Sequence, residues 1–294
     1  MTEFVQQVVD GLGRGGIYAL LALGIAVVFG VLHLLNFAHG EQVTVAGFTV
    51  YGLASIGADW WLLAPAAVVV AALTGVATER VAFRWVRNES PFTLLLTSFG
   101  LSIVIQAAFR MFVGQKKQFA RPGWVFDTTR IGGVNLEWYD LAVLAVTAVT
   151  LGAVLWLMRR TQFGLSLRAA AEDFDAARLM GVRADRVIAG AFALAGGLAG
   201  IAATLILLRR GQADPNMGLD PLLKAIVATI IGGLGSLSGA VIGGLALGVA
   251  EVAFRSWLPD EISGLTDGFV FLVIGLLLVF RPGGLISVER AERV

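Results

Sequence analysis

Long runs of uncharged, mostly apolar residues recur along this chain of 294 residues, and they constrain its fold more than any other feature. A helix that crosses the hydrocarbon core of a bilayer needs about 20 such residues. Runs without Asp, Glu, Lys or Arg cover residues 15–40, 60–78, 90–109, 141–158, 187–208 and 225–250. Because no soluble domain buries this many apolar helices, the sequence predicts an all-α polytopic membrane protein with one transmembrane domain over residues 1–294.

The composition excludes several other classes of protein. Hydrophobic residues make up 57% of the chain and charged residues 15%, compared with about 25% charged in an ordinary soluble domain. The chain has no Cys, which excludes a disulfide scaffold, a Cys-ligated zinc site and a thiol nucleophile. A net charge of +1 gives no indication of a nucleic-acid partner.

The number of spans depends on the side of the membrane that each loop faces. Arginines gather in segments 79–91, 159–186 and 281–294, which the positive-inside rule therefore predicts to be cytoplasmic. The tail then returns to the cytoplasmic side only if residues 222–254 cross the membrane twice, or enter and leave it on one face. This segment is shorter than the ~40 residues that two full spans need. We expect eight or nine transmembrane helices, some short or discontinuous, with a break in the glycine-rich stretch 232–244. The uncertain segment is 42–58; if it crosses, the N-terminus is outside.

A polar cluster containing Asn36, His39 and Glu41 follows the first long apolar run. Ionisable side chains at membrane depth are costly and usually face a cavity or a partner. Gly40 is a candidate for a helix break that exposes backbone groups to a ligand. The alternative is a cytoplasmic turn in which His39 and Glu41 are solvated, and sequence position alone leaves both open.

The segment of about 159–186 contains a short amphipathic pattern. One helix is predicted over 166–180, and Gly181 follows where a helix C-terminus favours glycine. Its apolar stripe consists of Leu167, Ala170, Ala171, Phe174 and Ala177. The helix is too short and too charged to span, so the stripe packs against the membrane interface, the same chain or a partner's groove.

Signatures of an enzyme are weak. The chain contains no Gly-x-x-x-x-Gly-Lys-Ser/Thr motif, and the glycines of 232–244 are more typical of close helix packing than of a ligand contact. His33 and His39 belong to no metal motif. No carboxylate pair lies inside an apolar run, so we expect no catalytic site, no metal site and few buried charges.

Several motifs together resemble the LivH-type branched-chain amino acid ABC transporter permeases. They lie at residues 16–24, 35–41, 168–188, 232–244, 247–251 and 281–285. The similarity follows the family's order over most of the chain and is weakest at 114–138 and 209–221.

The resemblance implies a multi-pass permease subunit of an importer in the bacterial inner membrane, which translocates Leu, Ile or Val. It implies four kinds of partner: a LivM-type permease subunit, two cytoplasmic ATPase subunits that use ATP and Mg, a periplasmic substrate-binding protein and membrane lipid. The chain itself would bind no cofactor and would not be an enzyme.

The resemblance also assigns candidate site residues. The short cytoplasmic helix would be a coupling helix docked in an ATPase groove, with Leu167, Ala171, Glu172, Asp173, Phe174 and Gly181 as coupling candidates. Asn36, His39 and Glu41 would lie at or near the translocation path.

Three other functions are compatible with the sequence. Related permeases are linked to urea and short amides, and the motifs do not separate these substrates. A stand-alone secondary transporter or channel would normally show intramembrane ionisable residues, and an intramembrane enzyme would need a nucleophile with a base, or metal ligands. Sequence also leaves open whether the permease pair is a homodimer or a heterodimer.

Overall fold

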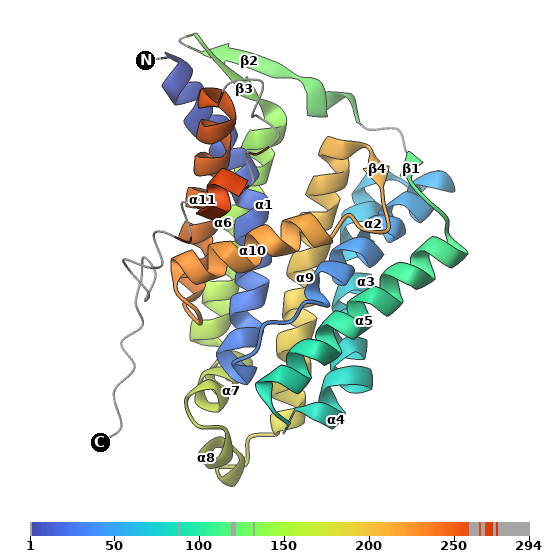
Figure 1. The fold of residues 1–294 in the computed structure, drawn as a ribbon, viewed down its shortest axis with the longest axis vertical. Helices are drawn as coiled ribbons and strands as arrows, with labels where there is room; N and C mark the ends of the chain where they lie inside the picture. Colours follow the sequence, from blue (N-terminus) through green and yellow to red (C-terminus); the bar gives the residue numbers. More distant parts are fainter. Residues whose placement is uncertain are drawn as a thin grey trace.

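The computed structural model describes residues 2–87, 89–118, 122–131, 133–258, 265, 268–272 and 275. Its helices are α1 (Thr2–Leu32), α2 (His39–Ser55), α3 (Trp60–Thr78), α4 (Arg84–Val86), α5 (Pro91–Phe112), α6 (Trp138–Arg160), α7 (Gln162–Glu172), α8 (Phe174–Leu179), α9 (Ala184–Arg210), α10 (Leu219–Gly232) and α11 (Leu237–Trp257) (Figure 1). A π-helical turn, η1 (Glu79–Phe83), joins α3 to α4, and a 3-10 turn, η2 (Gly123–Phe126), precedes β2. The strands are β1 (Lys117–Gln118), β2 (Thr128–Ile131), β3 (Val134–Glu137) and β4 (Gln212–Ala213).

Six helices within these residues are long and apolar enough to cross a membrane, which confirms a polytopic membrane protein. They cover Thr2–Leu32, Trp61–Val86, Pro91–Phe112, Trp138–Arg160, Asp185–Arg210 and Leu237–Trp257. α2 and α10 are shorter, with 17 and 14 residues. The candidate span 262–280 lies mostly outside the described residues, and the tail 281–294 entirely so. The count of eight or nine spans therefore stays a prediction.

Glycines let α1 and α11 approach until their backbones touch. A Cβ placed on Gly15 would lie 2.7 Å from the Leu245 Cα, and one on Gly248 would collide with the Gly15 backbone. Gly11 meets Val249 one turn further along, so the two helices run antiparallel. Small residues permit this close packing in membranes, and the result is a stiff α1–α11 pair.

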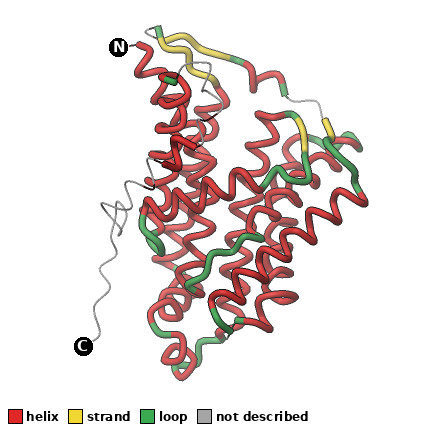
Figure 2. The backbone as a smooth tube through the Cα atoms, in the orientation of Figure 1, coloured by secondary structure: helices red, strands yellow, loops and turns green. Residues whose placement is uncertain are grey.

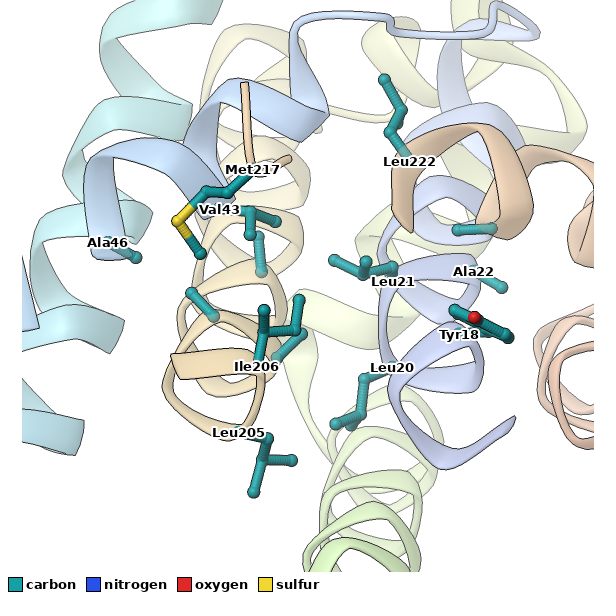
Figure 3. Packing of buried hydrophobic residues seen from close by; sticks show 14 of the residues in the cluster. Tyr18, Leu20, Leu21, Ala22, Val43, Ala46, Leu205, Ile206, Met217 and Leu222 are labelled. Atoms are coloured by element: carbon teal, nitrogen blue, oxygen red, sulfur yellow. The ribbon is translucent and has the colours of Figure 1, made fainter. Parts of the chain in front are cut away.

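A second pair forms in the same way from α3 and α9. A Cβ on Gly200 would lie 2.7 Å from the Val68 Cα and 2.8 Å from the Ala67 carbonyl oxygen, and Gly196 approaches the Ala71 carbonyl as closely. Between the two pairs, a Cβ on Gly24 of α1 would lie 3.4 Å from the Ala195 carbonyl oxygen of α9, and larger side chains pack as well. Figure 3 shows Leu21 of α1 and Ile206 of α9 pointing into the same space, and both are buried.

α10 lies across the long helices rather than along them (Figure 1). It ends at Gly232, and α11 begins at Leu237, where the Ser236 hydroxyl accepts a hydrogen bond from the Gly239 amide at 3.0 Å. Gly232 and Gly239 pack backbone to backbone across the turn. The predicted break in the glycine-rich stretch is thus confirmed, and one of the two helices it separates is short.

The two ends of the molecule differ in secondary structure. Figure 2 shows strands only at one end within the described residues, where β1 pairs with β4 and β2 with β3, both antiparallel. α4, α7 and α8 lie at the opposite end (Figure 1). The arginines of 79–87 and 159–186 therefore share one end of the bundle, as the orientation rule predicts.

Candidate functional site

The polar motif at the start of α2 lies inside the helix bundle. After α1 ends at Leu32, residues 33–38 turn back along it, beginning with His33 at a positive φ of 52°. The Asn36 Oδ1 then accepts a hydrogen bond from the Ala38 amide at 3.0 Å, which shapes the turn into α2. The expected helix break at Gly40 was wrong, because the break precedes His39 and Gly40 lies within α2.

Depth and burial decide between the two interpretations of this motif. The His39 ring faces Gly24, where a Cβ would lie 2.9 Å from the imidazole. Gly24 is two turns, or about 12 Å, before the end of α1. Asn36, His39 and Glu41 are only 4%, 2% and 1% exposed. A solvated cytoplasmic turn is therefore excluded, and the motif is part of the protein's interior.

The carboxylate of Glu41 receives hydrogen bonds from neutral donors on α5. Its Oε1 accepts from the Ser102 hydroxyl at 2.7 Å and from the Gln106 amide at 2.7 Å. Ser98, Ser102 and Gln106 are buried on one face of a helix that is otherwise widely exposed. This face was not predicted from the sequence, although the i, i+4, i+8 spacing of its polar residues in an apolar run was a readable signal.

Among the described residues, several buried polar atoms of this region make no hydrogen bond of normal geometry. They are the His39 Nε2, the Glu41 Oε2, the Gln42 Nε2 and the Thr44 Oγ1. On its other ring nitrogen, His39 pairs with the Gln42 Oε1 at 2.8 Å. Buried polar groups are nearly always satisfied in proteins, so such a group of incompletely satisfied donors and acceptors is suited to a polar ligand. We call Asn36, His39, Glu41, Gln42, Thr44, Ser102 and Gln106 the α2 polar cluster.

A second polar group, the Glu251 cluster, joins α1, α10 and α11. It consists of Arg14, Tyr18, Lys224, Glu251 and Arg255. Glu251 is 2% exposed; its Oε2 accepts from the Tyr18 hydroxyl at 2.7 Å and from the Lys224 Nζ at 3.2 Å. Its Oε1 lies 3.4 Å from Arg14 and 3.6 Å from Arg255. Each carboxylate oxygen is thus compensated by positive charge.

The Glu251 cluster corrects the expectation of few buried charges. Lys224 is 7% exposed and forms a pair with Glu251 inside the bundle. The two residues are 27 positions apart on different helices, so no local pattern could bring them together. No group of three His, Cys, Asp or Glu suited to a metal occurs in the described part of the chain.

The predicted coupling helix is two helices rather than one. α7 ends at Glu172 and α8 begins at Phe174, and Asp173 between them is extended, with φ −151° and ψ 106°. Its Oδ1 accepts a hydrogen bond from the Ala176 amide at 3.0 Å and so starts α8. The apolar stripe continues in sequence across this corner, which is why periodicity alone predicted a single helix.

α7 packs on its own chain. Leu167 is 6% exposed and belongs with Ala170 to an apolar core shared with α1, α6 and α9. Thr161 caps the helix by accepting from the Gly164 amide at 3.1 Å, and Arg168 donates to the Met158 carbonyl. The stripe's first residues are therefore unavailable to a partner, which corrects the assignment of Leu167 to a docking face.

The other coupling candidates divide between the corner and the tip. Ala171 is half-buried and Glu172 is exposed. The side chain of Phe174 lies outside the described residues, although the backbone there begins α8. Gly181 follows α8 with a φ of 87°, and this left-handed conformation after a helix favours glycine, as predicted. Beside it, Leu179 and Met180 are 89% and 86% exposed and were not among the candidates.

The family follows from comparison with known proteins. Residues 7–280 match the model of the family described as the permease component of the branched-chain amino acid transport system.

The chain belongs to this family.

Two curated relatives of this permease match it over almost their whole length. The BraD permease of the high-affinity branched-chain amino acid transport system of Pseudomonas aeruginosa is 31% identical, over 99% of this chain and 98% of its own. The corresponding LivH permease of Escherichia coli strain K12 is 32% identical, with the same coverage. The chain is thus a transport component of the membrane and not a catalytic subunit.

Proposed function

We propose that this chain is a membrane-spanning subunit of an ABC importer for Leu, Ile and Val in the bacterial inner membrane. The observation that carries the proposal is full-length similarity to BraD and LivH, which are named as permeases for branched-chain amino acids. ATP and Mg would be used by separate subunits, because the chain has no phosphate-binding loop motif.

The α2 polar cluster is the proposed contact of the translocation path with the substrate's polar end. A branched-chain amino acid carries an apolar side chain together with an ammonium and a carboxylate. The Glu41 Oε2 is an acceptor and the Gln42 Nε2 a donor, and both are buried without a normal hydrogen bond to the described residues. Gly40, between Asn36 and Glu41 in sequence, packs against α10 at Gly218, so the cluster adjoins the crosswise helix. Discontinuous helices near the bilayer midplane commonly hold transporter substrates.

The α7–α8 corner is the proposed route by which ATPase motion reaches the spans. An exposed tip at Leu179 and Met180 is available to a partner, whereas α7 is fixed to α1, α6 and α9 through Leu167. Displacement of the tip would therefore move the helix bundle as well. Nucleotide binding that favours one state of the ATPase pair would shift the permease between outward and inward access.

The remaining partners follow from the same proposal. A LivM-type permease subunit would complete the pathway, a periplasmic binding protein would deliver the substrate, and two ATPase subunits would bind on the arginine-rich end.

Uptake of labelled leucine by the reconstituted complex, compared with labelled urea, tests the proposed substrate. We expect ATP-dependent leucine uptake and no urea uptake above background. Urea uptake without leucine uptake would move the chain to the urea or short-amide permeases. Leucine accumulation by this chain alone in liposomes would instead indicate a secondary transporter.

The proposed coupling tip is tested with Leu179→Asp combined with Met180→Asp. Charge in an apolar contact prevents its burial, so we expect co-purification of the ATPase subunits to fall about tenfold with normal membrane insertion. Glu89→Gln, an exposed change at the same end, is the control. Unchanged co-purification in the double variant would refute the tip's role.

A further inference from the structure

Two adjoining hollows lie where the α3–η1–α4 helix meets the start of α9. The first, of about 320 Å³, is lined by Val76, Glu79, Arg80, Arg84, Asp185, Arg186, Ala189, Gly190 and Ala193. The second, of about 400 Å³, is lined by Arg87, Arg178, Val182, Arg183, Asp185 and Arg186. Asp185 and Arg186 belong to both. Neither hollow is part of the α2 polar cluster or the Glu251 cluster.

Positive charge dominates the rim of the hollows. Six arginines line them, against two carboxylates, Glu79 and Asp185. Asp185 pairs with Arg87 at 2.6 Å and with Arg84 at 3.2 Å. Within the described part of the chain, Arg80 and Arg186 form no ion pair. A guanidinium presents donors in a fork that matches phosphate oxygens, so the unmatched rim is suited to a phosphate group.

Below the rim, the first hollow becomes apolar. Val76 on α3 lies one helical turn from Arg80 on η1, and Ala193 lies two turns from Arg186 along α9. Ala189 and Gly190 line the same wall. A hollow with charge at the membrane surface and small apolar residues toward the interior matches a phospholipid, whose phosphate joins an acyl chain. A water-soluble phosphate would leave this apolar part unused.

The surroundings of the hollow place it at the membrane interface. Trp85 and Val81 are 80% and 72% exposed on the same helix. Tryptophan is enriched where hydrocarbon meets the headgroups, and basic pockets at the ends of membrane helices commonly bind anionic headgroups. Leu179 and Met180 at the exposed tip, by contrast, line neither hollow and are the apolar residues that a protein partner would bury.

Glu79 narrows the chemistry of the headgroup. Its side chain is buried, with the residue 2% exposed, and its Oε1 has no hydrogen-bond partner among the described residues. The residue begins the π-helical turn η1, a deviation that often marks functional positions. A buried carboxylate oxygen needs a donor. A headgroup that combines a phosphate with free hydroxyls supplies both the anion for the arginines and the donor for Glu79.

We propose that these hollows form a binding site for an anionic phospholipid with a hydroxylated headgroup, of the phosphatidylglycerol type. The phosphate binds Arg80 and Arg186, a glycerol hydroxyl donates to Glu79, and an acyl chain lies along the wall of Ala189 and Ala193.

Native mass spectrometry of the purified complex in detergent tests the site, with phosphatidylglycerol, phosphatidylethanolamine and phosphatidylcholine as probes. We expect phosphatidylglycerol to be retained at least tenfold better than phosphatidylcholine. Arg80→Gln with Arg186→Gln should abolish most of this preference. Arg159→Gln with Arg160→Gln removes the same charge from exposed positions at the end of α6 and should keep the preference.

Two further variants separate the lipid from other ligands and do not depend on the arginine variant folding. Ala189→Leu fills the apolar wall without changing charge, so it should lower phosphatidylglycerol retention severalfold. Glu79→Gln should reduce the preference for phosphatidylglycerol over phosphatidic acid, which lacks the hydroxyls.

Four results would overturn the proposal. The first is equal retention of phosphatidylglycerol in the Arg80/Arg186 and Arg159/Arg160 variants. The second is stronger retention of phosphatidylethanolamine than of phosphatidylglycerol. The third is displacement of the lipid by millimolar inorganic phosphate together with no effect of Ala189→Leu. The fourth is loss of the ATPase subunits from the Arg80/Arg186 variant alone, which would make the hollows a protein docking surface.

Discussion

Two buried glutamates on opposite sides of the bundle have opposite surroundings. Glu251 is held by Tyr18, Lys224 and two arginines, so both carboxylate oxygens face positive charge. Glu41 receives hydrogen bonds from neutral side chains of α5, and its second oxygen makes no normal hydrogen bond to the described residues.

The difference indicates two different uses of a buried carboxylate. A fully compensated charge can stay in one arrangement, so the Glu251 cluster fastens the crosswise helix α10 to α1 and α11. An incompletely satisfied carboxylate is costly unless another group binds it, so the α2 polar cluster is suited to transient binding. Variants of the two clusters should therefore separate stability from transport.

The largest expected effect is on stability, from Glu251→Leu. Removing this carboxylate leaves the buried Lys224 without its main counter-ion, a loss of about 3–5 kcal/mol in the free energy of unfolding. Thermal unfolding of the detergent-solubilised protein should show a much lower midpoint. Glu3→Leu, an exposed change on α1, is the control.

Replacing both partners sharpens the same test. Glu251→Leu with Lys224→Leu leaves neither charge uncompensated, so the double variant should recover much of the lost stability. A double variant as unstable as Glu251→Leu would contradict a paired structural role.

Glu41→Gln should have the reverse profile. The amide has almost the shape of the carboxylate and keeps an acceptor for Ser102, so the unfolding midpoint should change little. Leucine uptake should fall at least about tenfold, equivalent to about 1.4 kcal/mol, because the free acceptor for the substrate's ammonium is lost. Normal uptake would remove Glu41 from the translocation path.

Tyr18→Phe tests the Glu251 cluster more gently. It removes the 2.7 Å hydrogen bond to Glu251 and keeps the ring, so about 1–2 kcal/mol of stability should be lost. Uptake per folded molecule should stay near the wild-type value. A large fall in uptake with normal unfolding would place Tyr18 in transport rather than in the fastening of α10.

Ser102→Ala should have the smallest effect. Gln106 continues to donate to the Glu41 Oε1 at 2.7 Å, so uptake should fall only about two- to fivefold, with stability close to wild type. Ser98→Ala, on the same face but hydrogen-bonded to the Leu95 carbonyl, is the control. Equal effects in the two variants would indicate helix packing rather than the contact to Glu41.

Local features of the chain were predictable, whereas contacts between distant segments were not. The apolar runs predicted the membrane helices, and the glycine-rich stretch 232–244 predicted the turn before α11. Both were predictable because each signal lies within a single segment of the chain. Glu251 and Lys224 gave no such signal, since each is a single charge in its own apolar surroundings. The corner at Asp173 was missed because the apolar stripe continues in sequence and predicted one helix, whereas the Asp173 side chain caps α8 and starts a second helix.

The position of the α1–α2 turn was missed for a related reason. Gly40 looked like the flexible residue, but it is needed where α2 touches Gly218, and the turn is made by His33 and Asn36 instead. A glycine in sequence can mark a bend or a tight contact, and only the neighbouring segment decides which.

The glycine contacts determine where this protein can change shape. Interlocked backbones in α1–α11 and in α3–α9 resist sliding, because each small residue sits in a space that nothing larger fits. The boundary between the pairs has fewer such close backbone contacts and includes larger side chains such as Leu21 and Ile206, which can adopt new rotamers. Motion is therefore expected as a rocking of one half against the other, with residues 33–38 acting as the hinge and the α2 polar cluster beside its axis.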